Sequence, residues 1–339
     1  MPDRLTPRER FGLLVIDEPQ DRVPIFPLVT HHAAAVAGIS LHDYVTDGRR
    51  MARAQLRAQE MYGHDFISIF SEVGMVAEAF GSEFEYPADD LPVLRRPLLH
   101  TPGEFEKLAL PDFATAGRCR VYYDAIDLAY DAVGDRVPIL AYVPASFTTA
   151  MSLLPADEFL VGLTEAPEAA QELLSRITEG TIRFLTHILD HGGLPVLVDP
   201  LASGSVISPR TFRQHALPSL RRLISFLHHY DLDITLHICG DMMPMLELLP
   251  ETGADLVSLD RVDLGWACEV IGDRLRIIGN YGTTDILLNT PERIERDIQA
   301  MVREGRGNRK GHVAATGCEV PFRTPPENVR AFVRGARGG

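Results

Sequence analysis

The stretch EAAQELLSRITEGTIRFLTHILDHGGLPVLVDP, residues 168–200, contains the repeating unit that decides the fold. Its first part, 168–193, is an amphipathic run that ends in Gly-Gly, as expected where a helix stops. Its second part, LPVLVDP (194–200), is a short apolar run that is hydrophobic on both faces until Asp199. A helix followed by a strand buried on both faces is typical of a parallel α/β sheet.

The same unit recurs along the whole chain. Short apolar, β-branched runs are separated by helical patterns such as 290–305, which has Thr290 at the N-cap position and Pro291 in the first turn. Alternation of this kind in 339 residues predicts a (β/α)8 TIM barrel. A doubly wound sheet is the runner-up, but no G-x-G-x-x-G follows the first strand. The eight predicted strands are 23–29, 65–70, 137–144, 194–200, 233–239, 255–260, 276–280 and 312–316.

The domain organisation is expected to be simple. We predict one domain over residues 1–339, in which an N-terminal extension (1–22) precedes the barrel (23–339). The largest insertion should follow the second strand, where residues 85–113 are rich in proline and irregular. No low-complexity linker interrupts the sequence.

Composition excludes several classes of function. The net charge of −14 disfavours nucleic acid and acidic membrane surfaces as partners. No run of about 18 apolar residues is present, so no membrane span is predicted, and the charged N-terminus does not resemble a secretory signal. We therefore expect a cytoplasmic protein whose four cysteines stay reduced and free for metal binding or chemistry.

Polar and metal-binding side chains recur at the C-terminal ends of the predicted strands. A barrel of this kind carries its chemistry at those ends, so the recurrence indicates a functional site there. The residues concerned are Asp199, His237, Cys239, Asp260, Asn280 and Cys318.

DITLHICG (233–240) places a histidine and a cysteine two positions apart on a predicted strand. Because side chains alternate along a strand, His237 and Cys239 point the same way, roughly 6.6 Å apart along it, which two ligands of one metal can span. Cys318 lies on the strand that closes the barrel, beside Gly317, which we expect to let the backbone turn sharply. One histidine and two cysteines suit zinc with an open fourth position, and we expect the two sulfurs within about 6 Å of each other.

An ordinary structural role is the alternative for each of these residues. A His-x-Cys pair on a buried strand, taken alone, is more often part of the core than a ligand. Cys119 and Cys268 lie within predicted helices and are expected to be small buried residues. Paired histidines are usually structural or solvated, but His31, just past the first strand, is kept as a candidate for the site.

Three segments carry a resemblance to a known family. HICGDMMPMLELLPETGADLVSLD (237–260), RIIGNYGTTDILLNTPERIERDI (276–298) and GHVAATGCEVPFRTPPENVRAFV (311–333) resemble the uroporphyrinogen decarboxylase superfamily. Within it they look most like the methyl-corrinoid:thiol methyltransferases. The resemblance spans nearly the whole chain, and the first 100 residues are its loosest part.

The discriminating motif of that branch is H-x-C followed by a distant cysteine, which holds zinc there and maps onto His237, Cys239 and Cys318. Decarboxylases of the superfamily lack it, carry an arginine-rich stretch after the first strand, and have a catalytic aspartate in an FSD motif. In this sequence the stretch after the first strand reads FPLVTHHAAAVAG (26–38) and contains no arginine. The motif that corresponds to FSD reads FSE, with Glu72 as its last residue. A polycarboxylate substrate would be poorly held without those cations, so decarboxylation of uroporphyrinogen is disfavoured.

The resemblance implies a zinc-dependent methyltransferase that moves a methyl group from a methylated corrinoid to a small thiol, with Zn²⁺ lowering the pKa of the thiol. The chain has no D-x-H-x-x-G corrinoid-binding module, so methylcobalamin must arrive free or on a small corrinoid protein. Barrels of this superfamily often dimerise, so a homodimer is also expected. The alternatives are a decarboxylase relative acting on another tetrapyrrole or small acid, and a docking subunit without turnover.

Site residues beyond the metal ligands are also expected. Glu78 is the first choice, and Glu72 the second, for a carboxylate that fills the fourth zinc position until the thiol displaces it. Asp199 and Asp260 are candidates for hydrogen bonds to His237 or to the substrate, with a structural strand-end cap as the alternative. Polar contacts to the substrate are expected from His31, Ser203 and Asn280.

Overall fold

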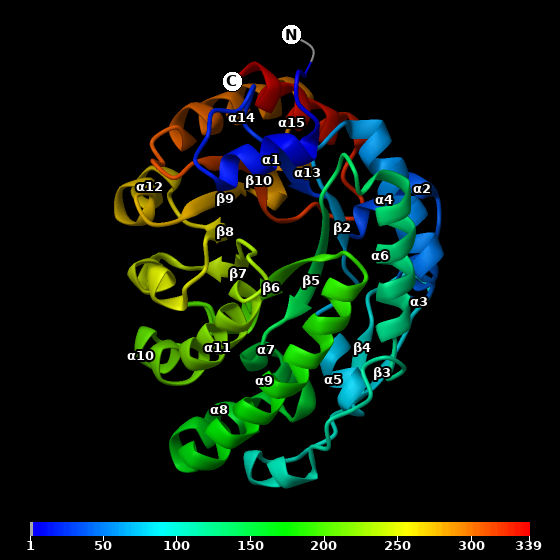
Figure 1. Cartoon of the computed structure of the whole chain (residues 1–339), viewed down its shortest axis with the longest axis vertical. Helices are drawn as coiled ribbons and strands as arrows, with labels where there is room; N and C mark the ends of the chain where they lie inside the picture. Colours follow the sequence, from blue (N-terminus) through cyan, green and yellow to red (C-terminus); the bar gives the residue numbers. More distant parts are fainter. Residues whose placement is uncertain (1–2) are drawn as a thin grey trace.

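The computed structural model describes residues 3–339 and confirms the predicted (β/α)8 barrel, including the insertion after its second strand (Figure 1). All eight predicted strands are present and their pairings are parallel. They are β1 (Ile25–Leu28), β2 (Ile67–Ile69), β5 (Ile139–Pro144), β6 (Leu194–Val198), β7 (Thr235–Asp241), β8 (Leu256–Arg261), β9 (Arg276–Tyr281) and β10 (His312–Glu319).

The barrel is nearly closed. Its strands follow the order β1-β10-β9-β8-β7-β6-β5-β2, so the last strand of the chain lies between the first strand and β9. The seam lies between β1 and β2, where the Asp65 backbone N–H donates to the Ile25 carbonyl at 2.9 Å.

Helices cover the outside of the barrel (Figure 1). Thr290 caps α14 through its side chain, which accepts from the Arg293 N–H, as the sequence predicts. The α-helices around the barrel are α2 (His32–Ala37), α3 (Leu41–Thr46), α4 (Gly48–Tyr62), α5 (Met75–Phe80), α6 (Cys119–Val133), α7 (Ser146–Leu153), α8 (Ala156–Glu165), α9 (Pro167–Asp190), α10 (Pro209–Thr211), α11 (Leu217–His228), α12 (Leu264–Ile271), α13 (Thr283–Leu288), α14 (Pro291–Gly305) and α15 (Pro326–Gly338). Shorter 3-10 or π segments are η1 (Pro102–Lys107), η2 (Pro200–Ala202), η3 (Phe212–Ala216) and η4 (Met243–Thr252).

The interior of the barrel is a packed apolar core. Because strand side chains alternate, every second residue of a strand points inward, and the inward set here is buried and hydrophobic. Its members are Phe26, Leu28, Phe66, Phe70, Leu140, Tyr142, Val196, Val198, Leu256, Ile278, Val313 and Ala315.

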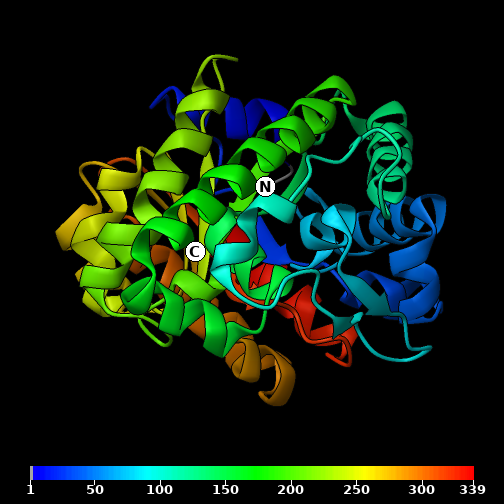
Figure 2. The same cartoon turned by 90° about the horizontal axis from the view of Figure 1, so that it is seen from below.

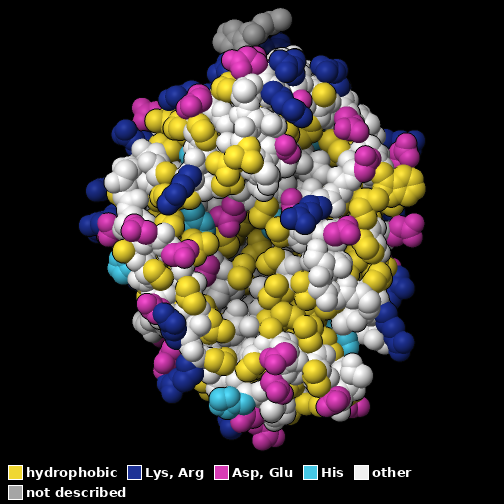
Figure 3. Space-filling model, turned by 180° about the vertical axis from the view of Figure 1, so that it is seen from behind, with side chains coloured by type: hydrophobic (Ala, Val, Ile, Leu, Met, Phe, Trp, Pro, Cys, Tyr) yellow, Lys and Arg dark blue, Asp and Glu magenta, His cyan; other side chains and the backbone are white. Residues whose placement is uncertain are grey.

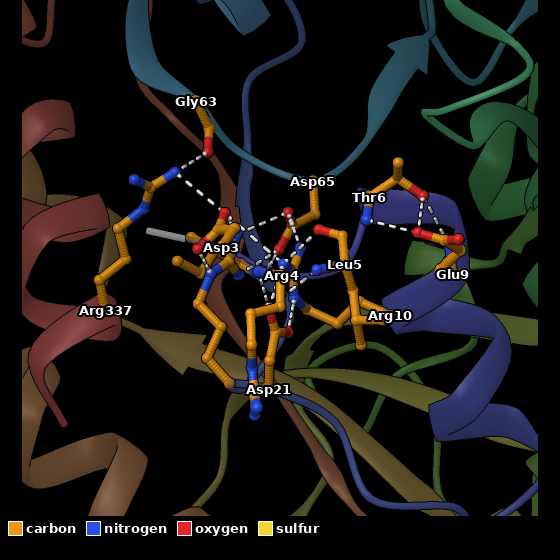
Figure 4. A network of polar contacts seen from close by, with 12 residues as sticks. Asp3, Arg4, Leu5, Thr6, Glu9, Arg10, Asp21, Gly63, Asp65 and Arg337 are labelled. Atoms are coloured by element: carbon orange, nitrogen blue, oxygen red, sulfur yellow. Dashed lines mark hydrogen bonds and ion pairs between the residues drawn. The ribbon is translucent and has the colours of Figure 1, made fainter. Parts of the chain in front are cut away.

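The N-terminal extension closes one end of this core. Helix α1 (Pro7–Val15) begins with a capping box, in which Thr6 and Glu9 satisfy each other's backbone N–H groups. Leu14 of α1 packs into the interior core. Arg10 is fully buried and donates to Asp21 at 2.7 Å and to Asp65 at 2.8 Å (Figure 4). The extension is therefore held at the N-terminal end of the strands.

The insertion after β2 is more regular than the sequence predicts. Two short strands, β3 (Glu83–Glu85) and β4 (Val93–Arg96), form an antiparallel hairpin inside the stretch expected to be irregular. The reason is packing: the Phe84 ring lies over Gly74, where an added Cβ would be 2.3 Å from the ring. The insertion lies against α3 (Figure 2), where the Tyr86 carbonyl is 3.0 Å from His42 Nδ1.

The C-terminal ends of the strands open on the face away from α1. In the space-filling view this face is hollowed, and hydrophobic side chains gather in the hollow (Figure 3). The loops after β6, β7, β8 and β10 surround this mouth, so it is the place where the predicted site should lie. Among residues 3–339, no helix has both the length and the apolar character needed to cross a membrane.

Candidate metal centre

The structure brings His237, Cys239 and Cys318 together at the mouth of the barrel. The Cys239 and Cys318 sulfurs are 3.5 Å apart, inside the expected limit of about 6 Å. The Cys318 sulfur is 3.9 Å from His237 Nε2. All three ligand atoms lie within 4.8 Å of one another, and in the described chain no other histidine, cysteine or carboxylate joins this group.

The Cys239–Cys318 and Cys318–His237 distances fit a single zinc ion. Tetrahedral zinc with bonds of about 2.3 Å to sulfur and about 2.0 Å to nitrogen holds its ligand atoms roughly 3.5–3.8 Å apart. Two thiolates and an imidazole are the soft and borderline donors that zinc prefers, whereas magnesium and calcium require oxygen. Three protein ligands leave the fourth position open to a substrate.

Ser258 orients the histidine, and sequence reasoning missed it. The parallel register places Ser258 of β8 opposite His237 of β7, and the Ser258 hydroxyl is 2.9 Å from His237 Nδ1. When Nδ1 carries the proton and donates to Ser258, the lone pair of Nε2 faces the two sulfurs. A partner of this kind fixes the ring and the tautomer of a metal-ligating histidine.

Asp260 lies against the same group. Its Oδ2 accepts from the Gly240 N–H at 3.1 Å and is 3.5 Å from the Cys239 sulfur. Gly317 allows Cys318 to reach this place through close approach: an added Cβ would be 2.7 Å from Asp260 Oδ1 and 3.0 Å from its Cα. The backbone turn predicted at Gly317 falls where the pairing of β10 with β1 is irregular, between the pairs Phe26–Ala315 and Leu28–Glu319, and the φ of Gly317 is not positive.

The two thiols influence each other strongly. A hydrogen bond from Cys318 holds the pKa of Cys239 below its usual value, although burial opposes this. The same hydrogen bond raises the pKa of Cys318, and burial adds to the increase. Without a metal, the pair therefore retains one proton that a metal would displace on binding.

Glu319, directly after Cys318, anchors the first strand to the last. Its Oε2 is 2.6 Å from His31 Nδ1 and also accepts from the Thr30 hydroxyl. His31 Nε2 is 2.5 Å from the Ser71 carbonyl, so both ring nitrogens of His31 have protein partners. Burial opposes charging of His31, but Glu319 raises its pKa. The substrate contact predicted for His31 is therefore not supported by its placement.

Arg118 holds the two glutamates that we considered for the fourth metal position. Its guanidinium is 2.6 Å from Glu72 and 2.9 Å from Glu78, and it stacks on the Tyr86 ring at 4.6 Å. The Tyr86 hydroxyl donates to Glu78 at 2.6 Å. Neither carboxylate belongs to the group of candidate ligand atoms. Sequence reasoning missed Arg118, because it comes directly before α6, far from any strand end.

Comparison with known proteins identifies the family. Residues 6–338 match the uroporphyrinogen decarboxylase (URO-D) family. The chain belongs to this family. The family prediction made from the sequence is thus confirmed.

Curated relatives of this URO-D family member carry two kinds of name. A methylated-thiol--coenzyme M methyltransferase of Methanosarcina mazei is 27% identical over 99% of this chain and 90% of its own. The methylcobamide:CoM methyltransferase MtbA of Methanosarcina acetivorans is 24% identical, over 98% of both chains. A uroporphyrinogen decarboxylase of Hydrogenovibrio crunogenus is 22% identical over 96% of this chain and 95% of its own.

A solved structure shares the fold of this URO-D family member. It is a methyltransferase from Methanosarcina mazei, which superposes with a TM-score of 0.90 over 99% of both chains at 24% identity. This similarity shows that the barrel, its N-terminal extension and its insertion occur together in a known fold.

The remaining predicted site residues of this URO-D family member differ in how fully the protein pairs them. Asp199 Oδ1 accepts from the Thr148 N–H near the start of α7 at 2.8 Å, and burial raises the pKa of Asp199 to about 7. The Asn280 amide donates to the carbonyls of Asp260 and Val262 and so ties β9 to β8. Ser203 is buried in the loop after β6. Asn280 thus fits the structural alternative considered for strand-end residues, whereas the Oδ2 atom of Asp199 is buried without a hydrogen-bond partner among residues 3–339.

Proposed function

We propose that this protein is a zinc-dependent methyltransferase that moves a methyl group from a methylated corrinoid to a thiol. The observation that carries the proposal is the convergence of His237, Cys239 and Cys318 at the mouth of the barrel. The names of the methyltransferase relatives support it. The distances between the ligand atoms agree with one tetrahedral ion that keeps a position free for the acceptor.

Zinc held by these three residues would keep the acceptor sulfur deprotonated at neutral pH, where a free thiol is only a few per cent ionised. The chain supplies the rest of the site. Ser258 holds His237 as a neutral ligand, and Cys239 and Cys318 contribute two negative charges that keep the acceptor sulfur electron-rich.

The transfer itself is a displacement at carbon. The thiol loses its proton to solvent, and its sulfur attacks the methyl carbon of the donor. The carbon–cobalt bond breaks, both of its electrons stay on cobalt, and the products are a thioether and a reduced corrinoid. The hollow and apolar mouth is compatible with a donor as large as a corrinoid (Figure 3).

The decarboxylase alternative is less well supported. In the sequence, Glu72 stands where the decarboxylases of the superfamily have their catalytic aspartate. Here the Glu72 carboxylate pairs with Arg118 at 2.6 Å and accepts from the Ser71 hydroxyl. That carboxylate is not free to act on a substrate, and no arginine follows β1 to grip a polycarboxylate.

A ligand variant tests the proposal. Cys318→Ser should lose most of its zinc and its methyl transfer from methylcobalamin to a panel of small thiols, because one of three protein ligands is gone. Metal analysis and the cobalt absorbance during turnover measure the two effects. Cys268→Ser is the matched control, because Cys268 lies in α12 outside the ligand group, and it should keep both.

Three outcomes would contradict the proposal. Full zinc content in Cys318→Ser would reject the ligand assignment. A wild-type protein with stoichiometric zinc but no transfer to any thiol would favour a docking subunit. Decarboxylation that survives loss of both Cys239 and Cys318 would favour the decarboxylase alternative. The cytoplasmic location, the small corrinoid protein as donor and the homodimer stay predictions.

A further inference from the structure

Tyr142 on β5 presents a buried hydroxyl without a protein partner. Its ring belongs to the interior core, and only 3% of the residue is exposed. Among residues 3–339, no group meets hydrogen-bond geometry with its hydroxyl oxygen, although the Ser68 hydroxyl lies near enough to lower its pKa. Buried tyrosine hydroxyls usually have a partner, because leaving one unpaired is unfavourable. The Tyr142 hydroxyl is therefore expected to have a hydrogen-bond partner that does not belong to the folded chain.

A series of contacts connects Tyr142 to the candidate metal centre. Its ring centroid is 5.3 Å from that of Phe70, and Phe70 is 5.7 Å from His31. His31 in turn contacts Glu319, the neighbour of Cys318. The strand register puts Tyr142 level with Val196 and Thr235, two residues before His237. The side chain thus lies inside the barrel just below the ligand group.

The hydroxyl stays protonated at neutral pH and therefore has a proton to donate. Burial raises the pKa of Tyr142 far above its usual value; the Ser68 hydroxyl opposes this, and the negative charges of Glu319 and Cys318 add to it. A protonated phenol that is buried near negative groups is stabilised when it donates a hydrogen bond to an acceptor. Glu319 already accepts from His31 and Thr30, and the two cysteine sulfurs are the candidate metal ligands.

We propose that the Tyr142 hydroxyl donates a hydrogen bond to the sulfur of the acceptor thiolate. This inference rests on the proposed function, because it needs an acceptor bound beside Cys318. It also specifies the chemical class of the acceptor. A thiolate keeps further lone pairs for attack after it accepts one hydrogen bond, whereas a neutral secondary amine has a single lone pair, which such a bond would occupy. The contact therefore selects a sulfur nucleophile over a nitrogen one.

Tyr142→Phe tests the contact through thiol binding. The protein is loaded with Co²⁺ in place of zinc, so that the sulfur-to-cobalt absorption band reports thiol binding directly, and 2-mercaptoethanol is the probe. Loss of a hydrogen bond to a charged group should weaken thiol binding about 10- to 100-fold. Metal content should stay stoichiometric. The melting temperature without thiol should not fall, because the hydroxyl stabilises no contact within the protein.

Tyr123→Phe is the matched control. Its hydroxyl is equally buried but donates to the Phe113 carbonyl at 2.8 Å on the outer side of the barrel. This variant should melt a few degrees lower and bind the thiol like the wild type. The inference is overturned if Tyr142→Phe binds the thiol with wild-type affinity, or if it melts as low as Tyr123→Phe, which would show a structural partner such as Ser68.

The two proposals fail in different ways. If the wild-type protein holds metal and transfers methyl groups but Tyr142→Phe matches it in thiol affinity, only the inference about Tyr142 falls. If the wild-type protein binds no metal or no thiol, the proposed function falls and the inference falls with it. If Tyr142→Phe binds the thiol more weakly while its metal content and melting temperature stay unchanged, both the proposed function and the inference about Tyr142 are supported.

Discussion

Ser258 decides which nitrogen of His237 faces the two sulfurs. A neutral imidazole binds metal through its unprotonated nitrogen, so the 2.9 Å contact between Ser258 and Nδ1 leaves Nε2 for the ion. His237 is buried, so bulk water does not readily replace the Ser258 hydroxyl as the partner of Nδ1. The serine would therefore influence metal binding although it is not one of the candidate ligands.

Ser258→Ala should weaken zinc binding about 10- to 100-fold, because the imidazole loses the partner that fixes its orientation. Competition against a coloured chelator measures the affinity. Ser82→Ala is the control: Ser82 is also buried, and its hydroxyl donates to the Ser152 carbonyl at 2.9 Å, away from the ligand group. Equal zinc affinities for the two variants would show that Ser258 does not orient the ligand.

The residues of the candidate site differ in how far the sequence could predict them. His237 and Cys239 are two positions apart on one strand, so alternation alone predicts that they point the same way. Ser258 depends on the register between β7 and β8, and the orphan hydroxyl of Tyr142 depends on the packing of the whole interior. Arg118 meets Glu72 and Glu78 only once the segment between β2 and α6 has folded. Local patterns cannot predict contacts of this kind.

Helix α1 shows that the N-terminal extension belongs to the folded barrel. Arg10 is fully buried and joins Asp21 and Asp65, and Asp65 also accepts from the Ile25 N–H at 2.7 Å (Figure 4). Asp65 comes just before β2 and Ile25 begins β1. The network therefore connects the extension to the two strands at the seam of the barrel.

Arg10→Met should lower the free energy of unfolding by about 3 kcal/mol, because Asp21 loses its cation and the buried Asp65 keeps only Arg22. Urea unfolding followed by circular dichroism measures the change. The control is Arg50→Met, which removes an exposed ion pair with Asp43 and should cost less than about 1 kcal/mol. A loss below about 1 kcal/mol for Arg10→Met would mean that the extension does not hold the seam.

At the level of elements, the sequence predicts what local periodicity determines. All eight strands occur where the apolar runs predict them, and α14 begins at its expected cap. The β3–β4 hairpin escaped prediction, because its strands have only three and four residues and most of them are exposed. Its cross-strand pairs of Glu83 with Arg96 and Glu85 with Arg95 form only once the two segments are adjacent.

Across the whole molecule, buried histidines make stability depend on pH. Burial, together with the charge of His32, lowers the pKa of His64 to about 3, and burial lowers that of His312 to about 4. In the unfolded chain these groups titrate near 6.5. Between pH 6.5 and about 4 the unfolded chain therefore binds protons that the folded chain does not, and stability falls as the pH falls.

His64→Gln should make this decline shallower by about 1.4 kcal/mol per pH unit between pH 6 and pH 4, because one such group is gone. Urea unfolding at several pH values gives the slope, which is informative even if the variant is less stable throughout. His229→Gln, at an exposed position, should leave the slope unchanged. An identical slope for His64→Gln and the wild type would show that His64 titrates normally in the folded protein.

The position of Cys318 has a consequence for biosynthesis. The chain leaves the ribosome from its N-terminus, and β10, which carries Cys318, is the last strand to emerge. A nascent or truncated chain that stops before β10 has neither the strand that joins β1 to β9 nor the third sulfur or nitrogen donor. Only a chain synthesised through β10 can therefore present all three side chains to an ion, so metal binding at this site would report that the last strand of the barrel has been made.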